Sequence, residues 1–165
     1  MNKIHCLTIA LFVLGSFAFA ASNLIGQPAP VFKGTTVSGE PFDLAEHLGK
    51  KPIILLFWNI LYPLWDIEAA YWTEARRKYR DQLLIVGINT LNSPEDTKEF
   101  MAKRRWFFPV LLDKNHSLAS TYRIFFNPTA VYIGIDGTII GYHAGYYKSH
   151  DYFISDIERV ISWRP

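Results

Sequence analysis

The sequence predicts an α/β fold with a mixed central β-sheet flanked by helices. Two apolar runs, Ile53 to Trp58 and Leu83 to Ile88, contain no charged residue, which is typical of strands buried on both faces. A segment with helical character follows each run. Later in the chain, Asp136–Gly137 separates two further apolar stretches and predicts a β-hairpin. Parallel strands joined by a helix and followed by an antiparallel pair give this fold class.

The length and the first residues indicate one domain behind a targeting segment. The chain has 165 residues, half of them hydrophobic and 19% charged, which is enough for one sizeable core. Lys3, an apolar run from Leu7 to Phe19 and the small residues Ala18 and Ala20 match a cleavable signal peptide. We therefore predict a signal peptide at 1–20 and one domain at 21–165, located in the bacterial periplasm or secreted. Only an uncleaved signal would connect the protein to a membrane.

The single cysteine and the nearly balanced charge argue against thiol chemistry and against nucleic-acid binding. Cys6 lies inside the predicted signal, so cleavage leaves neither a disulfide nor a thiol. The formal net charge is +2, which gives no field that would attract nucleic acid, and no nucleic-acid partner is predicted. The basic run Lys103–Arg105 closes a predicted helix, where cations suit the helix dipole. We interpret it as a solvated helix end rather than a binding patch.

The remaining elements follow from local signals. Pro28 and Pro30 exclude a regular helix from the extended segment that leads into the domain, and Ser93 with Pro94 marks a helix start. The expected elements, in order, are a turn at 38–39, a short strand or turn at 41–44, a helical turn ending at 49, a strand at 53–58, a helix at about 63–79, a strand at 83–89, a helix at about 94–105, an extended piece at 108–113, a short helix from 115 or 116 to 122, strands at 129–135 and 138–143, and a helix at about 149–163.

The helix after the central strand is predicted to be amphipathic. Its inner face is predicted from helical spacing to consist of Ile67, Ala70, Tyr71 and Ala75. Glu68 falls on the polar side of this pattern. Because Asp66 and Glu68 are two residues apart, they are expected to point in different directions and to favour the helix dipole rather than to act as an acid/base pair.

Four stretches, in the right order and at the right separations, resemble the thioredoxin-like proteins of the TlpA/ResA and AhpC/TSA redoxin group. Residues 25–32 resemble the family's "G-x-x-A-P-x-F" opening, and residues 57–65 resemble its "F-W-A-x-W-C-P-P-C" segment. Residues 122–129 resemble "Y-x-V-x-x-x-P-T", and residues 135–139 resemble the "D-G-x-I" hairpin. The resemblance implies a thioredoxin-like fold and membership of an exported thiol–disulfide oxidoreductase family.

The same resemblance shows what is missing. Tyr62 stands at the position of the attacking cysteine and Trp65 at that of the resolving cysteine, and Leu56 replaces a buried acid found in thioredoxins. A phenol with a pKa of about 10 and an indole cannot replace a thiolate. Pro128, after Asn127, resembles the family's cis-proline, which lies beside the cysteine pair and helps to present backbone groups to an extended substrate. No catalytic residue is therefore predicted.

A binding role follows as the leading hypothesis. Tyr62 and Trp65 fall where the family exposes its active site, and exposed aromatic side chains are typical of binding surfaces. The partner would be a protein or an extended peptide segment in the cell envelope. The predicted binding residues are Trp58, Tyr62, Pro63, Trp65, Asn127 and Pro128. Two alternatives stay open, namely a redoxin-type enzyme that uses external thiols or unrecognised chemistry, and a structural subunit of an envelope complex.

No metal or cofactor is predicted. The histidines that follow the predicted signal peptide lack the spacing that preorganises a metal site, and they are His47, His116, His143 and His150. Other aromatic groups are expected to lie away from the Tyr62 junction, and they are Trp106–Phe108, Phe125–Phe126 and Tyr146–Tyr147.

Overall fold

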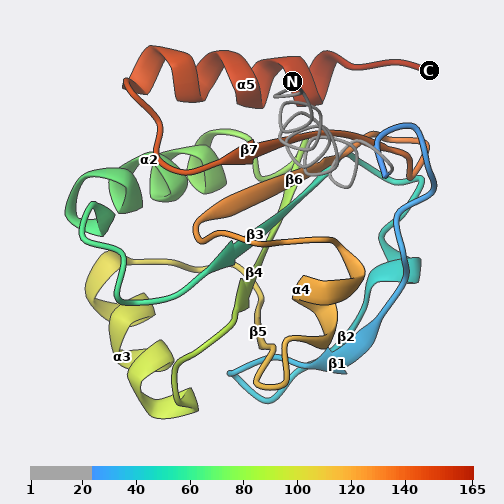
Figure 1. Cartoon of the computed structure of the whole chain (residues 1–165). Helices are drawn as coiled ribbons and strands as arrows, with labels where there is room; N and C mark the ends of the chain where they lie inside the picture. The colour runs from blue at the N-terminus through green and yellow to red at the C-terminus, as the bar shows by residue number, and fades with distance from the viewer. Residues whose placement is uncertain (1–23) are drawn as a thin grey trace, which may run out of the picture.

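The apolar run Ile53–Trp58 forms β3, the middle strand of a five-stranded sheet with the order β5-β4-β3-β6-β7 (Figure 1). The structure is a computed structural model that describes residues 24–165, and the predicted signal peptide lies outside them. β3 pairs in parallel with β4 (Leu84–Asn89) and antiparallel with β6 (Thr129–Ile133). β5 (Val110–Leu112) extends the parallel part and β7 (Ile139–Ala144) the antiparallel part. The predicted mixed sheet is confirmed.

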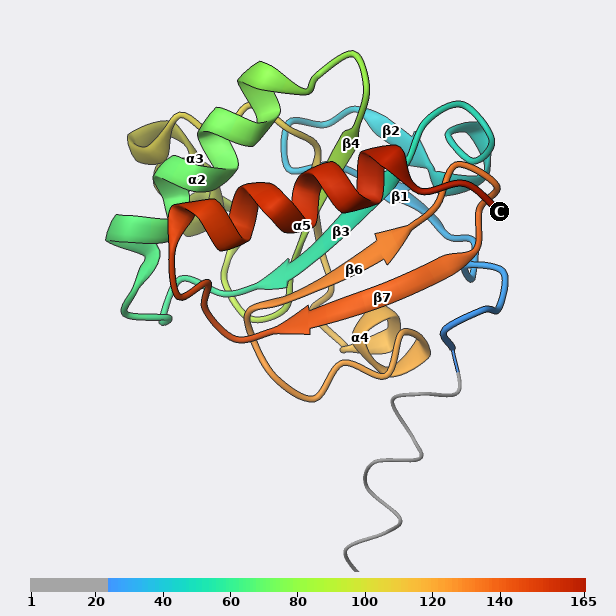
Figure 2. The same ribbon diagram turned by 90° about the horizontal axis from the view of Figure 1, so that it is seen from above.

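Helices cover both faces of this sheet. One face carries α2 (Trp65–Lys78), α3 (Pro94–Arg104) and α5 (His150–Ser162), and Figure 2 shows α2 and α5 side by side across the strands. The other face is covered by the short helix α4 (Ser117–Thr121) and by the amino-terminal part of the domain. That part contains β1 (Lys33–Thr35), β2 (Pro41–Asp43) and the 3₁₀ turn η1 (Leu44–Glu46).

Burial on both faces explains the uninterrupted apolarity of β3. Ile54, Leu56 and Trp58 point into the core under α2, α3 and α5, whereas Ile53, Leu55 and Phe57 belong to the core under α4. Successive side chains of a strand alternate between faces, so a strand covered on both sides needs apolar residues at every position.

Serine side chains cap the starts of α3 and α5 at the positions that the sequence predicts. The Ser93 hydroxyl accepts the Asp96 N–H at 3.1 Å at the start of α3, and the Ser149 hydroxyl accepts the Tyr152 N–H at 3.2 Å at the start of α5. The first residue of α2, by contrast, is Trp65, two residues later than predicted, and its cap Leu64 provides no side-chain hydrogen bond. Among residues 24–165, no helix is long and apolar enough to cross a membrane.

The predicted inner face of α2 is only partly correct, because Ala75 is buried and Tyr71 packs against the core, whereas Ile67 and Ala70 are exposed. The buried residues of α2 are Trp65, Glu68, Ala69, Trp72 and Ala75. Ile67, which was assigned to the core, is 58% exposed. The helix is rotated so that its two tryptophans, two turns apart, pack against the aromatic core, and this places Glu68 between them on the buried side.

Candidate functional site

The loop 59–64 joins β3 to α2 at the end of the sheet where β4 and β7 also end and β6 begins. The Ile60 N–H donates to the Asn92 side-chain oxygen at 2.9 Å, which ties this loop to the loop after β4. The Leu61 N–H donates to the Asn59 side-chain oxygen at 2.9 Å. Tyr62 is half-buried and Pro63 is exposed on this loop.

Trp65 belongs to the core and not to the surface, so the expectation that its side chain is exposed is wrong. Its side chain is only 1% exposed. Its indole N–H donates to the Asn59 carbonyl at 2.7 Å, and its ring packs edge-on against Trp58 and Trp106 at centroid distances of 5.9 and 5.2 Å. Trp58 is buried in the same cluster. Neither tryptophan is accessible to a partner, because both fill the space between α2 and the sheet.

Glu68 is an acidic residue buried in the core beside the junction loop. It is 2% exposed, and its Oε1 accepts the Tyr147 N–H at 2.7 Å and the Tyr62 hydroxyl at 3.4 Å. Its other carboxyl oxygen, Oε2, has no partner. Burial raises the pKa of Glu68 to about 7, and the hydrogen bonds from Tyr147 and Tyr62 offset part of the rise. The Tyr62 hydroxyl therefore contacts a carboxyl group that is half-protonated near neutral pH.

The burial of Glu68 could have been predicted from the spacing of the tryptophans in α2. Glu68 is three residues after Trp65 and four before Trp72, so a helix that buries both tryptophans also buries Glu68. No local pattern identifies Tyr147, which reaches Glu68 from a loop 79 residues away.

A buried polar network holds Tyr147 in place. Its hydroxyl is hydrogen bonded to that of Tyr132, which donates to Asp156 Oδ2 at 2.7 Å. The His143 ring stacks on the Tyr147 ring at 3.8 Å, and burial lowers the pKa of His143. Tyr147 is held at its hydroxyl by Tyr132 and on one ring face by His143, so its backbone N–H has a defined position against Glu68.

The segment before β6 closes the other side of this end of the sheet. The peptide bond between Asn127 and Pro128 is cis. The Asn127 side-chain amide donates to the Thr90 hydroxyl at 2.8 Å, and the Pro128 carbonyl accepts the Gly145 N–H at 2.8 Å. Asn127 and Pro128 are thus connected to the ends of β4 and β7, on the same end of the sheet as Tyr62.

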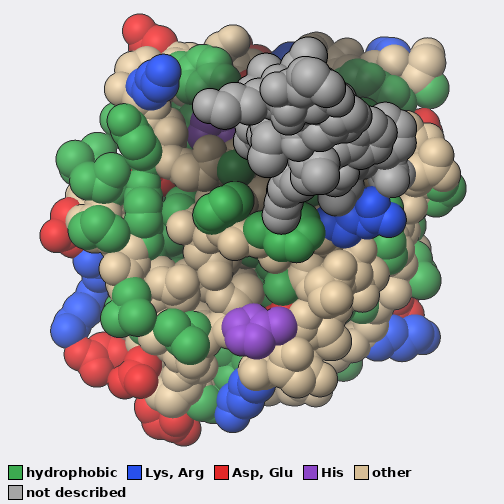
Figure 3. All heavy atoms as spheres, viewed as in Figure 1, with side chains coloured by type: hydrophobic (Ala, Val, Ile, Leu, Met, Phe, Trp, Pro, Cys, Tyr) green, Lys and Arg blue, Asp and Glu red, His purple; other side chains and the backbone are tan. Residues whose placement is uncertain are grey.

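Large apolar side chains are exposed on these loops. Leu61 is 72% exposed, Phe125 70%, Phe126 72% and Tyr146 52%. In Figure 3, hydrophobic side chains gather on the left of the molecule, where the loops after β3 and before β6 lie in Figure 1. We call Leu61, Phe125, Phe126 and Tyr146 the apolar end surface. The expectation that Phe125, Phe126 and Tyr146 lie away from the Tyr62 junction is wrong, because the antiparallel pairing of β6 and β7 returns their loops to this end.

Trp106 also lies beside the junction rather than elsewhere, since its ring contacts those of Trp58 and Trp65. His143 stacks on Tyr147 near this site, whereas His47 and His150 have partners away from the junction loop. His150 bonds Glu74 at 2.8 Å, and His47 stacks on Phe42. Within residues 24–165, no group of three or more His, Cys, Asp or Glu side chains is arranged to hold a metal ion.

Thiolate chemistry has no group to carry it at this site. No cysteine follows Cys6 in the sequence. Burial, and secondly the Glu68 carboxylate, raises the pKa of Tyr62 above its ordinary value, so its phenol stays protonated at neutral pH. The arrangement can offer apolar contact and hydrogen bonds, but it lacks the nucleophile of a disulfide exchange.

Known proteins share this fold and this sequence pattern. Residues 25–159 match the AhpC/TSA family. The thiol-disulfide oxidoreductase ResA of Bacillus cereus is 28% identical over 127 residues, which cover 76% of this chain and 73% of ResA. The soluble secreted antigen MPT53 of Mycobacterium bovis is 31% identical over 137 residues, 83% of this chain and 78% of MPT53.

A solved structure agrees with this relationship. The secreted Mycobacterium tuberculosis disulfide oxidoreductase homologous to E. coli DsbE has a TM-score of 0.70 and 28% identity, covering 80% of this chain and 96% of that one. The thioredoxin-like fold expected from the resemblance is confirmed. The chain therefore belongs to the AhpC/TSA family, as a thioredoxin-like relative of the thiol-disulfide oxidoreductases whose sequence contains a single cysteine, Cys6.

Proposed function

We propose that this protein is an exported, non-catalytic member of its family that binds an extended protein segment across the end of the sheet. The binding residues are those of the apolar end surface together with Tyr62, Pro63, Asn127 and Pro128. Trp58 and Trp65, being buried, support this surface from below. Export rests on the predicted signal peptide and on the names of two similar proteins, which describe them as secreted.

The observation that carries the proposal is the exposure of four large apolar side chains around one site. Leu61, Phe125, Phe126 and Tyr146 are each more than half exposed, and they come from three different loops. Exposing such side chains to water is unfavourable, and a contiguous group of them is typical of a binding surface. Aromatic side chains are also the commonest residues to dominate binding energy at interfaces.

The shape beside this surface fits a chain segment. A hollow of about 580 Å³ lies between the junction loop and α3, and Leu61, Tyr62 and Pro63 form part of its wall. Phe100 also lines it, and so do the charged residues Asp66, Asp96, Glu99, Lys103 and Arg104. A peptide lying across Pro63 and Pro128 could place an apolar side chain here while its backbone stays extended.

Binding is tested with an uncharged, fluorophore-labelled peptide rich in Leu, Phe and Ser, followed by fluorescence anisotropy. The variant Leu61→Ser, Phe125→Ser, Phe126→Ser should weaken binding by about tenfold or more, because it removes the central apolar contacts. The control Ile25→Ser, Val31→Ser changes exposed apolar residues before β1 and should leave the affinity within about twofold. Equal affinity for the wild type and the triple variant would rule out this surface.

The absence of catalysis is tested on the full chain carrying Cys6→Ser. In an insulin-reduction assay with dithiothreitol, this protein should give no rate above that of dithiothreitol alone, because no thiolate remains to attack the disulfide. Turnover above that background would instead favour an enzyme that works with external thiols. The peptide-binding result is independent of this outcome.

A further inference from the structure

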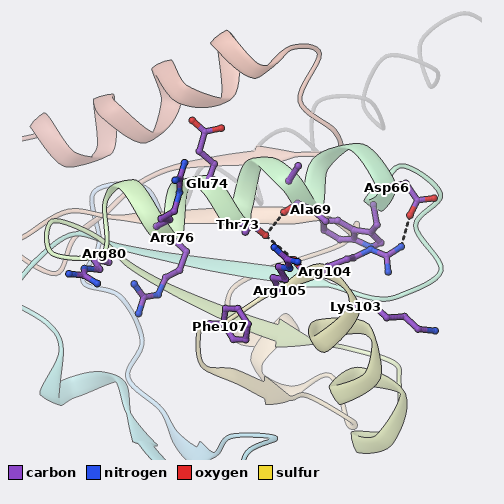
Figure 4. Close-up of a pocket in the computed structure, with 13 residues that line it drawn as sticks. Asp66, Ala69, Thr73, Glu74, Arg76, Arg80, Lys103, Arg104, Arg105 and Phe107 are labelled. Atoms are coloured by element: carbon purple, nitrogen blue, oxygen red, sulfur yellow. Dashed lines mark hydrogen bonds and ion pairs between the residues drawn. The ribbon is translucent and has the colours of Figure 1, made fainter.

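A second concave surface lies between α2 and the end of α3, away from the apolar end surface. It is a groove of about 970 Å³ (Figure 4). Six basic side chains line it: Arg76, Arg77, Arg80, Lys103, Arg104 and Arg105. The two acidic residues that line it are Asp66 and Glu74. The sequence places these cations in two separate runs, and only the packing of α3 against α2 joins them into one basic groove.

Hydrogen bonds hold the two walls together. The Thr73 hydroxyl of α2 lies 2.9 Å from the Ala69 carbonyl and 3.0 Å from the Arg104 carbonyl at the end of α3. The Trp106 indole N–H donates to the same Ala69 carbonyl at 3.2 Å. Figure 4 shows the two Thr73 contacts as dashed lines between α2 and the end of α3. The groove is therefore preformed, and a ligand would not have to order it.

Internal pairing satisfies both acids and leaves part of the basic charge unmatched. Asp66 binds Arg104 at 2.6 Å. Glu74 binds His150 at 2.8 Å, and in Figure 4 it points away from Phe107. Arg80 and Lys103 pair with acids outside the groove, Asp81 and Glu99.

Three arginines remain. Within residues 24–165, the side chains of Arg76, Arg77 and Arg105 form no hydrogen bond, ion pair or ring contact. A guanidinium group presents paired N–H donors that match a carboxylate. Phe107, 74% exposed, stands in the same groove and adds an apolar contact.

We infer that this basic groove binds an acidic segment of a partner protein, with its carboxylates on Arg76, Arg77 and Arg105 and an apolar side chain against Phe107. A polymer of dense negative charge, such as nucleic acid, fits less well, because Asp66 and Glu74 line the groove and the whole chain carries a net charge of only +2. A flat bilayer surface would not fill a concave groove. No residue of the apolar end surface lines the groove, although the hollow beside that surface shares Trp65, Asp66, Lys103 and Arg104 with it. Arg76, Arg77 and Arg105 line the groove alone, so replacing them tests this role apart from the proposed function.

The probe is a labelled peptide, Gly-Asp-Glu-Phe-Asp-Glu-Gly, measured by anisotropy against its neutral counterpart, Gly-Asn-Gln-Phe-Asn-Gln-Gly. The groove variant is Arg76→Gln, Arg77→Gln, Arg105→Asn; asparagine suits position 105 because its φ is 55°. The control removes the same charge from exposed positions outside the groove, with Lys50→Gln, Lys98→Gln and Lys114→Gln.

The groove variant should bind the acidic peptide about tenfold more weakly, and the control should stay within about twofold of the wild type. About 0.3 M NaCl should weaken binding several-fold in the wild type. Equal affinity of the groove variant and the wild type, or equal affinity for the neutral peptide, would overturn the inference. The inference would also be overturned if the wild type bound phosphatidylglycerol vesicles but not the acidic peptide, and if the groove variant lost the vesicle binding. Circular dichroism before titration checks that each variant is folded.

Discussion

Trp65→Ala should lower the free energy of unfolding by about 3–5 kcal/mol, the usual cost of removing a large buried aromatic side chain. Trp65 is 1% exposed and packs against Trp58, Tyr62 and Trp106, so alanine leaves a cavity among rings that cannot move together. The change also removes the indole hydrogen bond to the Asn59 carbonyl, which fixes the junction loop. Urea unfolding followed by far-UV circular dichroism measures the loss without depending on tryptophan fluorescence.

Ile67→Ala on the same helix is the matched control. Ile67 is 58% exposed, and its replacement should change stability by no more than about 0.5 kcal/mol. If Trp65→Ala proved as stable as Ile67→Ala, Trp65 would lie on the surface after all, and its place among the binding residues would be restored.

Glu68→Gln should change how stability depends on pH. The carboxyl group has a pKa of about 7 in the folded protein, above its ordinary value of 4.5. Between these two values the folded state keeps a proton that the unfolded state has released, so the free energy of unfolding of the wild type falls as pH rises. The shift corresponds to about 3 kcal/mol, present below about pH 4.5 and lost above about pH 7. Glutamine resembles the protonated acid and carries no such loss.

The difference between the two proteins isolates this effect. Stability is measured by urea unfolding at several values from about pH 4 to pH 8, and the variant should gain about 3 kcal/mol relative to the wild type over that range. His143, whose pKa is lowered by burial, contributes the opposite slope but is present in both proteins. Glu40→Gln, in the exposed turn between β1 and β2, is the control and should follow the wild type. If the curves of unfolding free energy against pH were parallel for Glu68→Gln and the wild type, the pKa of the buried Glu68 carboxyl group would not be near 7.

Local patterns identified most elements correctly because their causes are local. The charge-free run at 53–58 is β3, and Ser93 and Ser149 cap the helices that they were expected to begin. Asp136 and Gly137 lie between β6 and β7 as the hairpin prediction requires, with Gly137 at φ 84°. The strands of the hairpin are shifted from the predicted ranges by one or two residues, because the pairing of β6 with β3 and of β7 with β6, and not propensity, decides where they end.

The site was only partly predictable. The resemblance located Tyr62 and Pro128 at one end of the sheet, but not which side chains face water. Trp65 was expected on the surface and is buried, while Glu68 was expected on a polar face and lies in the core. In α2, large aromatic, small and charged residues lie on the same face. Helical spacing alone therefore does not show which face of α2 turns toward the sheet. The sheet and the neighbouring rings set that rotation.

By itself the sequence determined the order of strands and helices, the family and the loss of both cysteines, since these depend on residue type and local spacing. Tertiary structure decided the apolar end surface, where loops after β3, before β6 and after β7 meet, and the basic groove, where arginines of α2 face the end of α3. Both surfaces bring together residues far apart in the chain. Strand pairing and helix packing fix such proximity, and no local pattern encodes it.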